Sequence, residues 1–215
     1  MATAGASPDV PRVAARARLR EVARAGAPVV LARERCLEVP GPLGEVVPGL
    51  RRGAVVAVEG PPSAGATSLA LGLVAAASAA REWAAAVDGS GTLGGLAAIA
   101  AGVDLARFAV VRDVPGDRWA AVVAALLDGM SVVLAEVPRG VRVADARRLV
   151  ARARERDTVL VTLGAWPAAA TLRLHAEGGV WTGLGAGDGV LTARELAVRV
   201  EGPGAPVRGH VAIAV

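Results

Sequence analysis

The residues whose types and spacing could do chemistry form one glycine-rich loop, which follows a β-branched run at residues 54–59. The spacing matches the strand–G-x-x-x-x-G-K-[ST]–helix loop that cradles phosphates, with Gly60, Gly65 and Thr67 in place. Ala66 stands where that loop has the lysine that neutralises phosphate charge, and the sequence contains no lysine to replace it. A tight strand-to-helix turn with nothing bound accounts for the same glycines. We therefore expect a vestigial loop that holds no cofactor, made of Gly60, Gly65, Ala66, Thr67 and Ser68.

Other catalytic and metal chemistries find little support in the residue inventory. The single cysteine, Cys36, excludes an internal disulfide and a cysteine-based zinc cluster. The two histidines, His175 and His210, are too few and too isolated for a histidine metal site, and no Ser/His/Asp arrangement is suggested. We expect no catalytic residue, no metal and no enzymatic activity.

The elements that position the loop alternate between strand and helix. The apolar pattern predicts strands at residues 54–59, 83–87, 108–111, 131–135 and 158–163, and helices at 67–80, 92–101, 117–127 and 144–156. Strands that are apolar throughout indicate a parallel sheet covered by helices on both faces. After Trp166-Pro167 the pattern changes to strands at 171–176, 180–183, 190–200 and 207–215. These predict an antiparallel extension at one edge of an α/β fold.

The net positive charge of the chain comes from its N-terminal residues. Residues 1–36 contain seven arginines and three acids, so this arm carries the whole net charge of +4. Asp9 and Pro11 predict the start of a helix over 9–25. This helix either packs one solvated face on the body, docks on a protein partner or contacts a phosphate backbone. As its partner surface we expect Arg16, Leu19, Arg20 and Val22.

The remaining residues, 37–215, have the length of one domain. The longest apolar run, residues 69–80, is too short to cross a membrane, which needs about 20 residues. The first thirty residues lack the apolar core of a secretory signal. We expect a soluble, cytoplasmic protein without membrane contact.

Two tryptophans and one arginine-rich helix remain to be interpreted. Trp166 is either a buried residue that packs at the sheet edge or an exposed partner anchor, and we count it with the expected partner surface. Trp181 is expected to pack within the antiparallel extension. The arginines of the predicted 144–156 helix form either a solvated outer face or a contact for a partner or nucleic acid; they are Arg147, Arg148, Arg152, Arg154 and Arg156.

The flanking sequence resembles the RecA family of recombinases over residues 38–215. The stretches that carry the resemblance are 43–53 (LGEVVPGLRRG), 87–88 (VD), 101–108 (AGVDLARF), 119–129 and 132–136 (VVLAE). The resemblance implies a RecA-like three-layer fold with a mainly parallel central sheet and an antiparallel C-terminal extension.

This sequence departs from the RecA family at the positions of its catalytic and DNA-binding residues. The family's Mg²⁺-site aspartate falls on Ala135, and the position of its activating glutamate falls near Gly89 and Ser90. Strand alternation points the adjacent Glu136 to the other face. The connections at 137–143 and 164–169 are too short for the family's DNA-binding loops. A RecA-like ATPase that grips single-stranded DNA is therefore not expected.

One branch of the family fits these losses. The degenerate loop, the stretch 181–185 (WTGLG) and the lysine-free composition resemble the ImuA-type proteins of GC-rich bacteria. This resemblance implies a non-catalytic accessory protein of the SOS mutasome, which supports translesion synthesis through protein contacts and is nucleoid-associated after DNA damage. The implied partners are an inactive Y-family polymerase-like protein (ImuB type) and, through it, an error-prone C-family polymerase and a sliding clamp.

Three alternatives remain open. One is a cell-division inhibitor of the SulA type, which shares a RecA-like fold without a working phosphate loop. Another is a weak ATP-binding RecA-like protein that obtains its cation from an arginine. The third is a weak direct contact between the basic arm and DNA, which would fall steeply with salt.

Overall fold

The computed structural model describes residues 36–185, 188–203 and 207–214. The expected helix over 9–25 and the expected partner residues Arg16, Leu19, Arg20 and Val22 lie outside these described residues. The described chain starts with a small antiparallel pair that the sequence analysis missed. It consists of β1 (Cys36–Glu38) and β2 (Gly49–Arg51), joined by the short helix α2 (Leu43–Val46). Cys36 therefore belongs to the first strand of the body.

A central sheet of eight strands organises the body, in the order β10-β9-β8-β3-β7-β6-β4-β5. Its parallel strands are β3 (Val55–Glu59), β4 (Ala84–Val87), β5 (Phe108–Val111), β6 (Val132–Glu136) and β7 (Val159–Leu163). Each lies within a residue or two of its expected position. The expectation of an α/β fold with a mainly parallel sheet is confirmed for the described residues.

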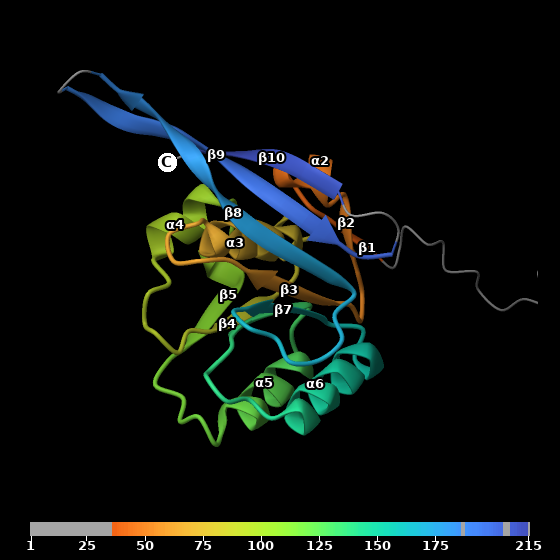
Figure 1. Ribbon diagram of the computed structural model, residues 1–215. Helices are drawn as coiled ribbons and strands as arrows, with labels where there is room; N and C mark the ends of the chain where they lie inside the picture. Colours follow the sequence, from red (N-terminus) through yellow and green to blue (C-terminus); the bar gives the residue numbers. More distant parts are fainter. Residues whose placement is uncertain (1–35, 186–187, 204–206, 215) are drawn as a thin grey trace, which may run out of the picture. The chain divides into compact units, whose positions relative to one another are not determined.

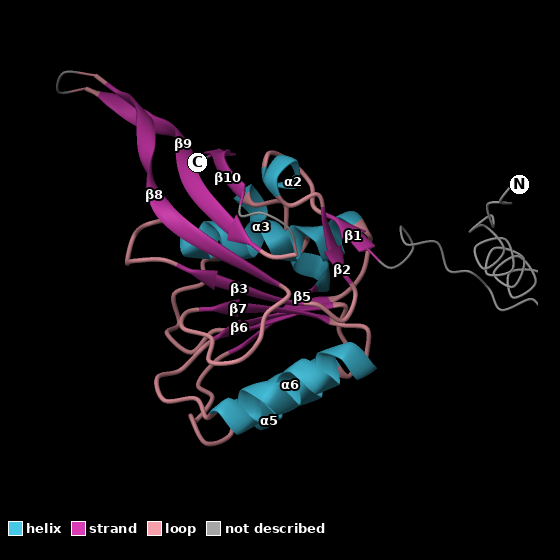
Figure 2. Ribbon diagram, turned by 45° about the vertical axis from the view of Figure 1, so that its right-hand side comes forward, coloured by secondary structure: helices cyan, strands magenta, loops and turns pink. Residues whose placement is uncertain are grey.

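Helices cover both faces of the parallel part of the sheet (Figures 1 and 2). On one face lie α3 (Ala66–Ala79) and α4 (Gly95–Ala100), and on the other lie α5 (Trp119–Leu127) and α6 (Val143–Glu155). A 3-10 turn, η2 (Leu105–Arg107), leads into β5. The core is divided by the sheet: Val56 and Val58 of β3 face α3, whereas Val55 and Ala57 join the cluster under α5 and α6. Because both faces are buried, these strands are apolar at every position.

The antiparallel extension begins beside β3. Strand β8 (Leu172–Leu184) runs parallel to β3, and β9 (Gly189–Glu201) and β10 (Val207–Ala214) follow in antiparallel order. The expectation of two separate strands at 171–176 and 180–183 is wrong, because a bulge between Ala176 and Gly179 keeps them in one strand. The far part of β8 and β9 forms a two-stranded ribbon that extends past α4 (Figure 1).

None of the helices in the described part of the chain is long and apolar enough to cross a membrane.

Candidate functional site

The glycine-rich loop has the expected strand–loop–helix geometry. It connects the end of β3 to the start of α3, and Gly65 caps the helix with a φ of +101°. A Cβ atom at Gly65 would lie 2.6 Å from Cδ1 of Leu196, and one at Gly60 would lie 2.9 Å from the carbonyl oxygen of Ala176. Both glycines are therefore required by the close approach of the extension, and Gly65 also by its left-handed backbone. Packing of β8 and β9 against the loop explains them without any bound phosphate.

The lysine position of the loop carries no charge. Ala66 is the first residue of α3, and Thr67 and Ser68 follow it in the first helical turn. Within the described part of the chain, one cation hydrogen-bonds to the loop: the guanidinium of Arg194 on β9 donates to the carbonyl oxygen of Ser63 at 2.5 Å. The same guanidinium lies 4.9 Å from the ring centre of Trp181. Arg194 is thus engaged with a backbone carbonyl and an aromatic face.

The acidic side chains at the carboxyl ends of the parallel strands accept hydrogen bonds from neighbouring residues of the chain. Asp88, at the end of β4, is 1% exposed and accepts hydrogen bonds from the backbone of Thr92 (3.0 Å) and from Nε of Arg112 (2.9 Å). Glu136 accepts one from the backbone N–H of Ser90 at 2.8 Å. Ala135, where a metal-binding carboxylate was sought, is fully buried. The carboxylates of Asp88 and Glu136 thus bind backbone N–H groups of residues 90–93.

Metal binding receives no support elsewhere in the described ranges. No group of three or more His, Cys, Asp or Glu side chains in residues 36–185, 188–203 and 207–214 is placed to hold an ion.

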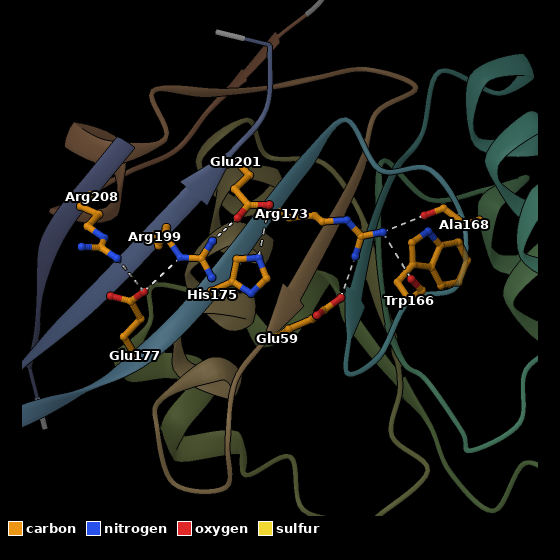
Figure 3. A network of polar contacts seen from close by, with 9 residues as sticks. All are labelled: Glu59, Trp166, Ala168, Arg173, His175, Glu177, Arg199, Glu201 and Arg208. Carbon is orange, nitrogen blue, oxygen red and sulfur yellow. Dashed lines mark hydrogen bonds and ion pairs between the residues drawn. The ribbon is translucent and has the colours of Figure 1, made fainter. Parts of the chain in front are cut away.

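Of the two interpretations of Trp166, the buried one is confirmed, and its place in the expected partner surface as an exposed anchor is wrong. Its side chain is 4% exposed and belongs to the core cluster under α5 and α6. The indole Nε1 donates to the carbonyl oxygen of Ala169 at 3.4 Å, and Arg173 donates to the carbonyl oxygens of Trp166 and Ala168 (Figure 3). The short 164–169 connection folds back on the core because its backbone carbonyls are satisfied by this arginine.

The face of β8–β10 that points away from α3 carries a network of paired charges (Figure 3). Arg173 pairs with Glu59 at 2.8 Å, and Arg199 pairs with both Glu177 and Glu201. His175 lies 3.7 Å from Glu201, and Arg208 lies 4.0 Å from Glu177. Arginines and glutamates alternate across the strands, so their charges compensate one another. This face is therefore a weak candidate for anion binding.

Helix α6 displays the expected arginines on its outer side, where several of them pair with acids. Arg152 and Arg156 both pair with Asp128 of the α5–β6 connection, and Arg148 pairs with Asp145. The hydrogen bond from Arg152 holds the pKa of Asp128 below its usual range, and the charge of Arg156 acts in the same direction. Arg147 and Arg154 are exposed at the rim of a second hollow of about 380 Å³ between α6 and the 167–169 loop.

An apolar groove of about 810 Å³ lies beside α3. Its walls come from α3, α4, the ribbon, β10 and the loop before α2. Among the described residues that line it, Arg194 alone is charged. Leu96 of α4 is 84% exposed at the groove, and Trp181 is 44% exposed, so Trp181 does not pack fully within the extension as expected. Sequence analysis missed this groove, and its only local signal was a leucine on a short alanine-rich helix.

Comparisons with known proteins give one family match and one relative. The sequence model of a family described as the MT3502 N-terminal domain matches residues 45–168. Rv3395c, an uncharacterized protein of Mycobacterium tuberculosis (strain ATCC 25618 / H37Rv), is 48% identical over 115 residues, which are 53% of this chain and 55% of the relative. The chain thus matches about half of the length of this relative. The family match includes the loop and β3 to β7 and ends before the ribbon.

Proposed function

The chain belongs to the family of the MT3502 N-terminal domain, and from this premise we propose that it is a non-catalytic accessory protein with a RecA-like body. It acts through protein contacts in a DNA-damage-induced mutasome and supports translesion DNA synthesis. The RecA-like assignment is supported by three features. These are the parallel sheet with helices on both faces, the glycine-rich loop after the interior strand β3, and the antiparallel strands beside it.

The main observation behind the proposal is that the glycine-rich loop keeps the geometry of a phosphate-binding loop but lacks its lysine. Gly65 still turns the chain into α3, yet Ala66 occupies the lysine position and Arg194 donates to the loop's own carbonyl. A charge-assisted hydrogen bond contributes roughly 1.5–3 kcal/mol, so a loop without one holds phosphates weakly. Ala135 removes the carboxylate expected to hold Mg²⁺. The retained scaffold is therefore assigned to binding other proteins.

The proposed partners are an inactive Y-family polymerase-like protein and, through it, an error-prone C-family polymerase and a sliding clamp. Support for protein contacts comes from the surface: the groove is apolar, and large apolar side chains such as Leu96 and Ile99 are exposed on α4 beside it. Exposed apolar patches of this kind are typical of interaction sites.

Calorimetric titration with Mg-ATP and with a non-hydrolysable analogue tests the loss of nucleotide chemistry. We expect the parent protein to bind neither more tightly than about 1 mM. Ala66→Lys is the matched positive control, since a lysine in an intact loop should raise the affinity by about 10-fold or more. Submillimolar binding by the parent, or Mg²⁺-dependent turnover that Thr67→Ala abolishes, would show that the protein is a nucleotide-dependent enzyme.

A co-purification experiment tests the partner. The full chain is mixed separately with the purified inactive Y-family protein and with the tubulin-like division GTPase. We expect a stable complex with the first and none with the second. Binding of the division GTPase alone would instead favour the cell-division inhibitor.

A further inference from the structure

We propose that the apolar groove beside α3 binds an amphipathic helix of a partner protein, which presents one acidic side chain within its apolar face to Arg194. This inference rests on the proposed function as a protein-contact module and specifies the surface and the partner segment. The lining residues on which the argument depends are Gly72, Leu96, Ala97, Ala100, Trp181 and Arg194.

The walls of the groove fit a helix. The alanines Ala97 and Ala100 of α4 present small, exposed side chains, and Gly72 of α3 lies against Leu43. The ribbon contributes Trp181 to the lining. Small residues allow another helix to approach closely, and packed helices lie 8–10 Å apart. A helix placed here would continue the layer that α3 and α4 already form on this face of the sheet.

An added strand fits the groove less well. Strand addition uses the unpaired backbone groups of a sheet edge, whereas helix-in-groove binding uses apolar side chains at i, i+3, i+4 and i+7. The groove offers side chains from two helices and from the inner face of the ribbon. Leu96, at 84% exposure, is the natural contact for such an apolar stripe.

The charge pattern specifies the partner further. Of the groove's lining residues in the described ranges, Arg194 alone carries a charge, and its guanidinium lies over the ring of Trp181. One of its donors reaches the carbonyl oxygen of Ser63, and its Nε is enclosed by the protein, so an incoming group does not reach that atom. A carboxylate on the incoming helix would instead be attracted by the positive charge of the guanidinium, and a basic side chain there would be repelled.

The proposal is tested with two synthetic 18-residue helical peptides that are identical except at one position. Both carry leucines at i, i+3, i+4 and i+7 spacing, and one has glutamate and the other lysine within that stripe. Binding of the labelled peptides to the full chain is measured by fluorescence anisotropy. We expect the glutamate peptide to bind at least 10-fold more tightly than the lysine peptide, and Arg194→Gln to remove most of this difference. Equal binding of the two peptides, or no binding of either, would overturn the proposal.

Groove variants establish where the peptide binds. Ala97→Glu and Leu96→Asp change exposed residues of α4 and are expected to weaken the glutamate peptide at least 10-fold. Ala121→Glu places the same charge on the exposed side of α5, on the opposite face of the sheet, and should bind the peptide like the parent. Unchanged binding by both α4 variants would contradict the assignment. So would a dimer of the parent that Ala97→Glu dissociates, since the groove would then hold a second copy.

The two proposals fail in different ways. If the inactive Y-family protein does not bind but the glutamate peptide does, the mutasome assignment fails and the groove assignment stands. If the Y-family protein binds Ala97→Glu and the parent equally well and the peptides do not discriminate, the groove assignment alone fails.

Discussion

The carboxylate of Asp88 lies 2.9 Å from Nε of Arg112, and it is buried while the guanidinium is half exposed. The same carboxylate accepts from the backbone N–H groups of Thr92 (3.0 Å) and Leu93 (3.2 Å). Arg112 also donates to the carbonyl oxygen of Leu93 at 2.9 Å. One buried acid therefore fixes the loop that leads from β4 into α4, the helix that carries Leu96.

Replacing Asp88 should destabilise the fold. Asp88→Ala removes three hydrogen bonds and leaves the backbone donors of Thr92 and Leu93 without an acceptor, so we expect a loss of about 2–4 kcal/mol. Asp104→Ala is the control: Asp104 also accepts from a backbone N–H, that of Ala106, but it is exposed and should cost less than about 1 kcal/mol. Urea denaturation at neutral pH compares them, and equal losses would refute the role of Asp88.

Substitution of Gly65 tests the geometry of the loop. Gly65→Ala forces a side chain onto a φ of +101° and places its Cβ 2.6 Å from Leu196, so we expect a loss of about 1–3 kcal/mol. Gly94 also precedes a helix, but its φ is −85° and an added Cβ would meet nothing within 4 Å. Gly94→Ala should stay within about 0.5 kcal/mol of the parent in thermal unfolding. A neutral Gly65→Ala would mean that β9 does not close on the loop.

Replacing each of the two C-terminal tryptophans by alanine should lower the stability of the fold by very different amounts. Trp166 is 4% exposed and fills the core under α5 and α6, so Trp166→Ala should cost about 3–5 kcal/mol. Trp181 is 44% exposed and stacks on Arg194, so Trp181→Ala should cost less than about 1 kcal/mol. Chemical denaturation of both variants measures the difference. If Trp166→Ala were as mild as Trp181→Ala, the folded-back 164–169 connection would be wrong.

Glu82 makes stability depend on pH. Burial by itself would raise the pKa of Glu82, but hydrogen bonds from Arg52 and Ser131 and the charge of Arg52 outweigh it and lower the pKa. A carboxyl whose pKa is lower when folded stabilises the fold above its unfolded pKa, about 4.3, and loses that contribution as pH falls through the folded value.

Glu82→Gln should therefore be less stable than the parent at pH 7, by less than about 1 kcal/mol, because the pair with Arg52 is partly exposed. The difference should shrink as the pH is lowered from 5 toward 2, as followed by urea denaturation at each pH. Glu38→Gln, at an exposed position of β1, serves as the control. A constant difference between Glu82→Gln and the parent across this range would exclude the pH contribution.

The local pattern of residues was sufficient to predict the elements. Strands such as β3 and β7 are apolar at every position because both of their faces are buried, and helices end at glycines such as Gly102 and Gly129. The loss of the loop's lysine is likewise a property of the sequence alone, since the chain contains none. The bounds shifted, two expected strands merged into β8 around the bulge at residues 176–179, and the β1–β2 pair was missed because it is too short to leave a periodic signal.

Tertiary structure decided which surfaces meet. Periodicity shows which face of an element is apolar, but it does not show which distant face will cover it. The groove combines Pro40, Gly72, Leu96, Trp181 and Ile213, which come from five separate segments, so no local pattern could reveal it. The burial of Trp166 and the contact of Arg194 with Ser63 follow from the same long-range packing. Arg173, which binds the carbonyl of Trp166, is on β8 and Arg194 is on β9, and these strands reach their places beyond β3 only when the sheet forms.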